Sequence, residues 1–176
     1  MKRKSSHFAL LTAFLLGCGL AYGQGSLGAK PKRARTPDDY KSRTLKEVAA
    51  EGSNTESRGN KEETMIVTAD ILPSRVRVTL AGSARPIPQL KKEVLRQWAR
   101  LYAGAIESYT KPYETEMLFN EDGREYWLAV KQRSLPGLKE LKQGERLDLY
   151  LIRVGAARAD GGWEPLLLIE SFQKPK

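Results

Sequence analysis

Apolar and polar residues alternate with a period of two along much of residues 65–176, which is the pattern of half-buried β-strands. The clearest case is 75–80, where Val76, Val78 and Leu80 alternate with polar residues. Further strands are predicted at 65–70, 113–120, 125–131, 146–154 and 163–172. Turns that contain glycine are expected at 121–123, 142–145 and 160–162. Pro165 indicates that the last strand begins at a sheet edge.

A helical period replaces the strand period between residues 89 and 106. The apolar stripe of this predicted helix consists of Leu90, Val94, Trp98, Leu101, Tyr102 and Ala105. The other face carries Lys91, Lys92, Arg96 and Arg100. A stripe of this kind favours packing against a core, and attachment to a membrane surface is the alternative.

The later strands carry apolar side chains on both faces, so each face must pack against another part of the fold. In 146–154, the side chains of Leu147, Leu149 and Leu151 face one way, and those of Ile152 and Val154 face the other. The expected fold is therefore mainly β (α+β), a small antiparallel β-barrel of oligonucleotide/oligosaccharide-binding (OB-like) or SH3-like type. Five to six strands would form it, with one amphipathic covering helix. We place this single domain at 64–176.

Residues 1–23 have the three parts of a secretory signal peptide: a basic start, an apolar run and small residues ahead of a cleavage site. Two processing outcomes are open. The signal is cut after Gly23, or it is cut before Cys18, which would then carry a lipid in the manner of bacterial lipoproteins. Both outcomes predict an exported protein of the periplasm, cell envelope or exterior.

Residues 24–63 are poor in large apolar side chains, which predicts a disordered basic linker. Thr44 and Glu47 form a capping box for one short helix within it. The linker contains a basic run at Lys30, Lys32, Arg33 and Arg35. This run is suited to anionic envelope polymers or lipid headgroups, and a solvated tether without a partner is the alternative. Because export is expected, nucleic acid is not an expected partner.

Composition excludes much enzyme chemistry from the mature chain. The only histidine, His7, lies within the signal, and the only cysteine, Cys18, precedes Gly23. Removing residues 1–23, with three cations and no acids, leaves 27 Lys and Arg against 21 Asp and Glu, a net charge of +6. Triads that need His are ruled out, and we expect no catalytic residue, metal site or cofactor. Glu114 and Glu116, placed on one strand face, could serve a glycoside hydrolase, but such acids are usually a solvated side.

Aromatic residues are the remaining candidates for recognition. Tyr126 and Trp127 are adjacent on one strand and must point to opposite faces. An exposed Trp127, flanked by Arg124, Lys131 or Arg133, could stack on a sugar ring or anchor a peptide. The alternative is that Trp127 is buried under the helix beside Trp98. The sequence thus favours a non-catalytic binding or scaffold domain of the envelope, with a protein partner open, over a carboxylate-dependent hydrolase of envelope polymer.

Overall fold

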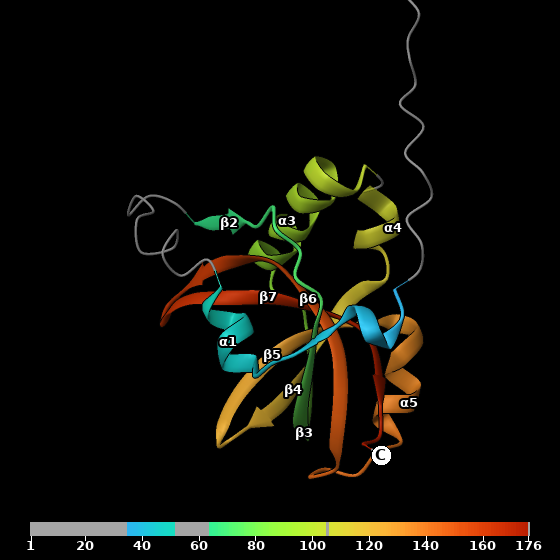
Figure 1. The fold of residues 1–176 in the computed structure, drawn as a ribbon. Coiled ribbons are helices and arrows are strands. Elements are labelled where there is room, and N and C mark those ends of the chain that lie inside the picture. The colour runs from blue at the N-terminus through green and yellow to red at the C-terminus, as the bar shows by residue number, and fades with distance from the viewer. Residues whose placement is uncertain (1–34, 52–63, 105, 176) are drawn as a thin grey trace, which may run out of the picture. The chain divides into compact units, whose positions relative to one another are not determined.

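The computed structural model describes residues 35–51, 64–104 and 106–175. The described residues belong to one compact unit that begins at Arg35 (Figure 1). The predicted signal peptide, Cys18 and the basic residues Lys30, Lys32 and Arg33 lie outside them. No helix of the described part is both long enough and apolar enough to span a membrane.

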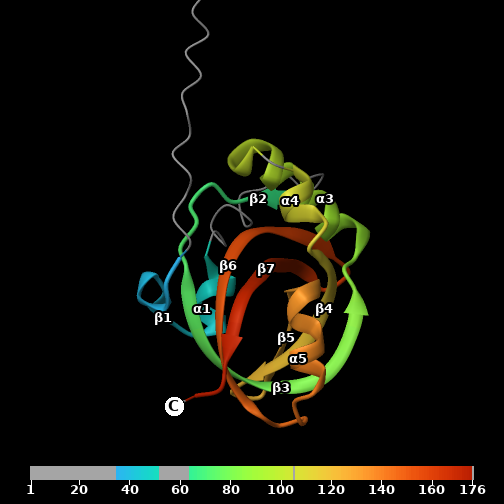
Figure 2. The same ribbon diagram turned by 90° about the vertical axis from the view of Figure 1, so that its right-hand side faces the viewer.

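Five strands close a small barrel (Figure 2). They are β3 (Ser74–Pro86), β4 (Tyr113–Glu121), β5 (Arg124–Lys131), β6 (Arg146–Ala159) and β7 (Gly162–Gln173). Their hydrogen-bonded order is β3-β4-β5-β7-β6, and β3 pairs with β6 to close the ring. The predicted small β-barrel with a covering helix is confirmed. The expectation of a wholly antiparallel sheet was wrong, because β5 and β7 run parallel.

The turns that join the strands use the predicted residues. In the β4–β5 hairpin, Asp122 and Gly123 have φ values of 52° and 82°. Two successive positive φ values match the right-handed twist of the flanking strands, and Asp-Gly is a preferred pair for such a turn. The connection from β5 to β6 contains η3 (Gln132–Ser134) and α5 (Leu135–Lys139).

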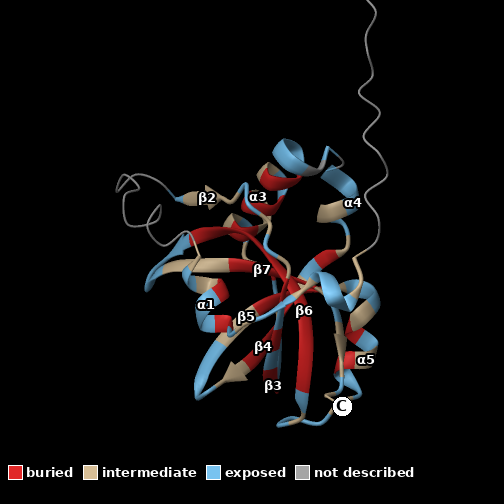
Figure 3. Cartoon of the chain, in the orientation of Figure 1, coloured by how far each residue is buried: buried red, intermediate tan, exposed pale blue. Residues whose placement is uncertain are grey.

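The barrel interior is filled by apolar side chains (Figure 3). Every strand contributes alternate residues to it, including Val76 from β3, Phe119 from β4 and Leu149 from β6. The helices α1 (Leu45–Ala50) and α5 add further buried leucine and valine side chains. Hydrophobic burial in this interior is therefore the main source of the fold's stability.

Residues 35–51 belong to this folded unit and not to the linker predicted at 24–63. Leu45 and Val48 of α1 are fully buried in the interior, because a helix with two apolar residues three apart can cover an open barrel. The predicted capping box is confirmed: the Thr44 hydroxyl accepts from the Glu47 N–H at 3.1 Å, and Glu47 accepts from the Thr44 N–H at 2.8 Å.

The chain before α1 is also attached to the barrel. It forms the short helix η1 (Pro37–Asp39) and then β1 (Lys41–Ser42), which pairs in parallel with β3. The Tyr40 ring packs edge-on against Tyr150 of β6, with 5.1 Å between the ring centres. We call residues 35–51 the strap.

A second apolar layer covers the outer surface of the barrel. It lies between β6 and β7 on one side and α3 (Gln89–Trp98), α4 (Ile106–Thr110) and β2 (Met65–Val67) on the other. Gly155 of β6 permits this approach, because a Cβ atom there would lie 2.2 Å from the Ile66 carbonyl oxygen and 2.6 Å from a Val94 methyl group. The predicted packing of the helix on a core is thus correct for α3.

The predicted helix 89–106 is not continuous. Regular α-helix ends at Trp98 and is followed by a π-helical turn, η2 (Ala99–Ala103). Gly104 then takes a left-handed conformation with φ of 65°, which ends the helix. As a result, Leu101 and Tyr102 leave the apolar stripe and are exposed.

Candidate functional site

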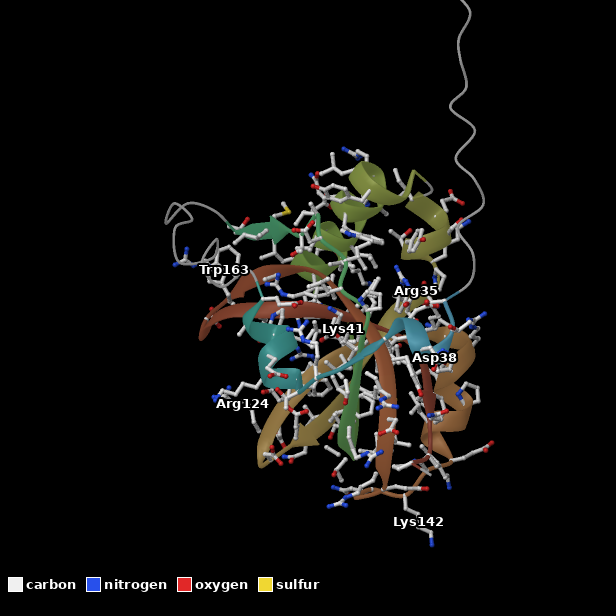
Figure 4. All side chains as sticks on the ribbon, in the orientation of Figure 1. Arg35, Asp38, Lys41, Arg124, Lys142 and Trp163 are labelled. Atoms are coloured by element: carbon white, nitrogen blue, oxygen red, sulfur yellow. The ribbon has the colours of Figure 1, made fainter. Side chains whose placement is uncertain are left out.

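The four residues predicted to form a binding surface do not come together. Arg124 is exposed at the start of β5 (Figure 4), and Trp127 lies in the middle of the strand. Lys131, at the far end, has its Nζ 5.8 Å from the centre of the Tyr113 ring, and Arg133 follows in η3. The spread along an extended strand separates the cations, since each residue advances the chain by about 3.3 Å.

Trp127 and Tyr126 face opposite sides of the sheet, as predicted. Tyr126 packs against the barrel interior. Trp127 is half-buried on the outer side, and the Arg85 guanidinium lies 4.2 Å from the centre of its ring. Trp127 is thus neither fully exposed nor fully buried, and the edge-on aromatic partner of Trp98 is Tyr109 of α4, 5.1 Å away.

Arg85 belongs to an ion network between α3 and the barrel. Its centre is Glu116 of β4, which has no exposed surface. The Glu116 carboxylate is 2.8 Å from Lys91 Nζ and 2.9 Å from Arg85 Nη2. Glu164 of β7 completes the network, 3.1 Å from Lys91 Nζ and 3.4 Å from Arg85 Nη2. Two acids and two cations therefore neutralise one another in a mostly buried position.

The network holds Glu164 in its charged form. Partial burial raises the pKa of this carboxyl. The hydrogen bond from Lys91 and the positive charges of Lys91 and Arg85 together lower it by more than burial raises it. The net pKa lies below the ordinary value of 4.5. Glu164 is thus a hydrogen-bond acceptor at neutral pH.

The predicted carboxylate pair is not assembled. The pairing of β4 with β5 shifts between Tyr113 and Thr115, so a β-bulge interrupts the alternation around Glu114. Glu114 is exposed and accepts a hydrogen bond of 3.1 Å from Gln132, whereas Glu116 is buried under α3. One carboxylate is therefore on the surface and the other is in the buried ion network.

A cleft opens where β5 and β7 separate. The two strands pair only through Ala129–Leu168 and Val130–Ile169, and Pro165 has no N–H with which to extend the ladder. The cleft has a volume of about 140 Å³. Its walls are formed by Lys91, Glu125, Tyr126, Trp127, Leu128, Glu164, Pro165 and Leu167. We call it the β5–β7 cleft.

Arg35, predicted to be part of a polyanion-binding run, is engaged within the domain. Its Nη1 atom lies 2.6 Å from a carboxylate oxygen of Glu170 on β7, and the Tyr40 hydroxyl donates to the same oxygen at 2.6 Å. Burial and the hydrogen bond to Glu170 raise the pKa of Tyr40. This cluster fastens the strap to β7. We take the β5–β7 cleft as the candidate ligand site because Trp127 forms part of its wall.

Sequence reasoning found Trp127 but missed the groups that surround it. Arg85, Lys91 and Glu164 come from β3, α3 and β7, which only the fold brings together. Within the described residues, no group of three or more Asp, Glu, His or Cys side chains is placed to hold a metal ion. No protein-family model matches the chain, and no curated protein matches it.

Proposed function

We propose that this protein is a non-catalytic binding domain that receives its ligand in the β5–β7 cleft. The observation that carries the proposal is the short pairing of β5 with β7, which leaves an opening in the barrel wall. The opening combines aromatic and aliphatic walls with a few polar groups, which is the usual composition of a ligand site. The export predicted from residues 1–23 would place the domain in the cell envelope or beyond.

The ligand class that suits the cleft best is a sugar ring of an envelope glycan. Trp127 offers aromatic surface to the C–H groups of such a ring. Glu125 and Glu164 lie at the cleft and can accept hydrogen bonds from its hydroxyl groups. Barrels of OB type use the corresponding strand face for oligosaccharides, and this supports the choice by analogy of fold.

The arrangement of the acids supports binding over hydrolysis. Glycoside hydrolysis needs two carboxyl groups that flank the scissile bond. Glu116 is held by Lys91 and Arg85 with no exposed surface, and Glu114 lies outside the cleft. Neither is placed to move a proton to or from a ligand in the β5–β7 cleft. Two other acids, Glu125 and Glu164, do line the cleft. Lys91 and Arg85 lower the pKa of Glu164, whereas the general acid of a glycoside hydrolase needs a raised pKa.

The test is a binding titration with soluble peptidoglycan fragments. We expect Trp127→Ala to weaken binding by about tenfold or more, since replacing an aromatic side chain that stacks on a ring ligand by alanine costs on the order of 1 to 3 kcal/mol. Trp163→Phe is the matched control, because Trp163 also lies beside an arginine, 5.7 Å from Arg158, and is not part of the cleft wall. Circular dichroism would verify that both variants remain folded.

Two results would decide against the proposal. One is equal affinity of the wild type and Trp127→Ala for every fragment that binds. The other is release of product from peptidoglycan that is abolished by Glu114→Gln or Glu116→Gln, which would establish the hydrolase instead.

A further inference from the structure

Three large apolar side chains stand exposed at the end of the helical layer. Leu101 and Tyr102 of η2 and Ile106 of α4 are 61, 42 and 37 % exposed. Among the described residues, Leu72 is the one other large apolar side chain that is exposed. We call the three residues the helical tip, which lies at the top of Figures 1 and 3.

The exposure of the helical tip follows from the backbone. The π-helical turn contains one residue more than a regular helical turn. Leu101 and Tyr102 therefore rotate out of the apolar stripe to which Val94 and Trp98 belong. Single π-helical turns are rare and are frequently found at functional sites. A regular helix over the same residues would have kept the stripe on one face.

Basic side chains flank the helical tip along the chain. Lys92 and Arg96 belong to α3, Arg100 belongs to η2 and Lys111 follows α4, against the acids Glu93 and Glu107. Arg96 pairs with Glu93, and Lys111 pairs with Glu107 at 2.6 Å. The surplus is two positive charges. Lys91 is excluded from this balance because it is buried with Glu116.

We propose that the helical tip inserts into the surface of an anionic lipid bilayer. The helical tip projects from the fold and does not form a groove. Its side chains therefore suit a partner surface that is soft enough to let them enter. Leucine and isoleucine would enter the acyl region, tyrosine would lie at the level of the headgroups, and the surplus cations would meet anionic lipid. Attachment through so few residues is weak and reversible, so a second attachment would have to add to it.

This inference is independent of the β5–β7 cleft, because the cleft uses Lys91 of the first helical turn and no residue of the helical tip. It also gives the predicted N-terminal region a complementary role. A lipid on Cys18 or the basic run at residues 30–33 would supply the second attachment that stable membrane binding requires.

The experiment measures binding of residues 24–176 to vesicles of phosphatidylcholine with and without phosphatidylglycerol. We expect binding to the mixed vesicles, and a loss of about fivefold or more in Leu101→Asp. Leu72→Asp is the matched control, an exposed leucine between β2 and β3, and should bind as the wild type does. Arg100→Glu should weaken binding to mixed vesicles and have little effect with pure phosphatidylcholine.

Depth of insertion provides a second readout. Tyr102→Trp adds a tryptophan at the helical tip. Brominated lipid should quench the fluorescence of this added tryptophan, so quenching should be greater than in the wild type. The proposal is overturned if Leu101→Asp binds vesicles like the wild type, or if binding disappears only when Lys30, Lys32 and Arg33 are replaced by serine. It is also overturned if Leu101→Asp abolishes self-association in sedimentation velocity while vesicle binding is unchanged, since the tip would then contact a second copy.

Discussion

The barrel interior and the layer between the barrel and α3 are both buried, but they are built differently. The interior is filled by a large cluster of apolar side chains. The outer layer has an apolar part as well, and beside it Glu116 and Lys91 are buried as ions, with side-chain exposures of 0 and 3 %. A buried ion pair contributes little net stability compared with apolar groups of the same size. The difference indicates that the interior stabilises the fold, whereas the outer network fixes the position of α3 beside the cleft.

The largest effect is expected from a cavity in the interior. Leu149→Ala should lower the free energy of unfolding by about 2 to 5 kcal/mol, because Leu149 is fully buried among apolar neighbours. Denaturant titration measures this. Leu72→Ala, at a leucine that is 46 % exposed, should cost much less. Equal losses would mean that burial in the interior does not dominate stability.

The next effect concerns the apolar part of the outer layer. Gly155→Ala should cost about 1 to 3 kcal/mol, because the added methyl group would displace β2 or α3 from β6. Gly161→Ala is the control, since a Cβ atom there would meet no atom within 4 Å. If Gly155→Ala is as stable as Gly161→Ala, the outer layer adapts more freely than close packing allows.

The smallest effect is expected at the ion network. Lys91→Met should lower the free energy of unfolding by about 1 to 2 kcal/mol. Removal of one partner of a buried ion pair usually costs more, but here Arg85 remains 2.9 Å from Glu116. The double variant Lys91→Met with Glu116→Met should recover most of this loss, since no buried carboxylate is left without its lysine. Both variants should bind glycan less tightly, because α3 would be less firmly placed. A double variant less stable than either single one would show that the network itself stabilises the fold.

Periodicity alone was sufficient to predict the barrel. Each predicted strand overlaps a strand of the structure, and the alternation within 146–154 correctly placed Leu149 and Ile152 on opposite faces of one strand. Strand ends were less predictable: β6 continues to Ala159 because β7 pairs along its whole length. The parallel neighbours β5 and β7 could not be inferred, since pairing between distant strands depends on the path of the chain and not on local pattern.

The site was only partly visible in the sequence. Lys91 was assigned to the polar face of its helix, yet it recurs in phase with Val94, Leu95 and Trp98, which are all buried. A charged residue within an apolar stripe signals a buried partner, and that signal could have been used. The partner, Glu116, could not be identified, because it lies 25 positions along the chain on another element. Likewise, the burial of Leu45 depends on strands that follow it.

The position of β7 constrains when the protein can fold during its synthesis. Of the described strands, β7 is made last, yet in the finished barrel it lies between β5 and β6. The strap is the first described segment to be made, and Leu45 packs among residues of strands that are translated much later. A nascent chain therefore has neither a closed wall nor a filled interior until β7 has been synthesised. Premature termination before β7 would yield a chain with exposed strand edges and no barrel.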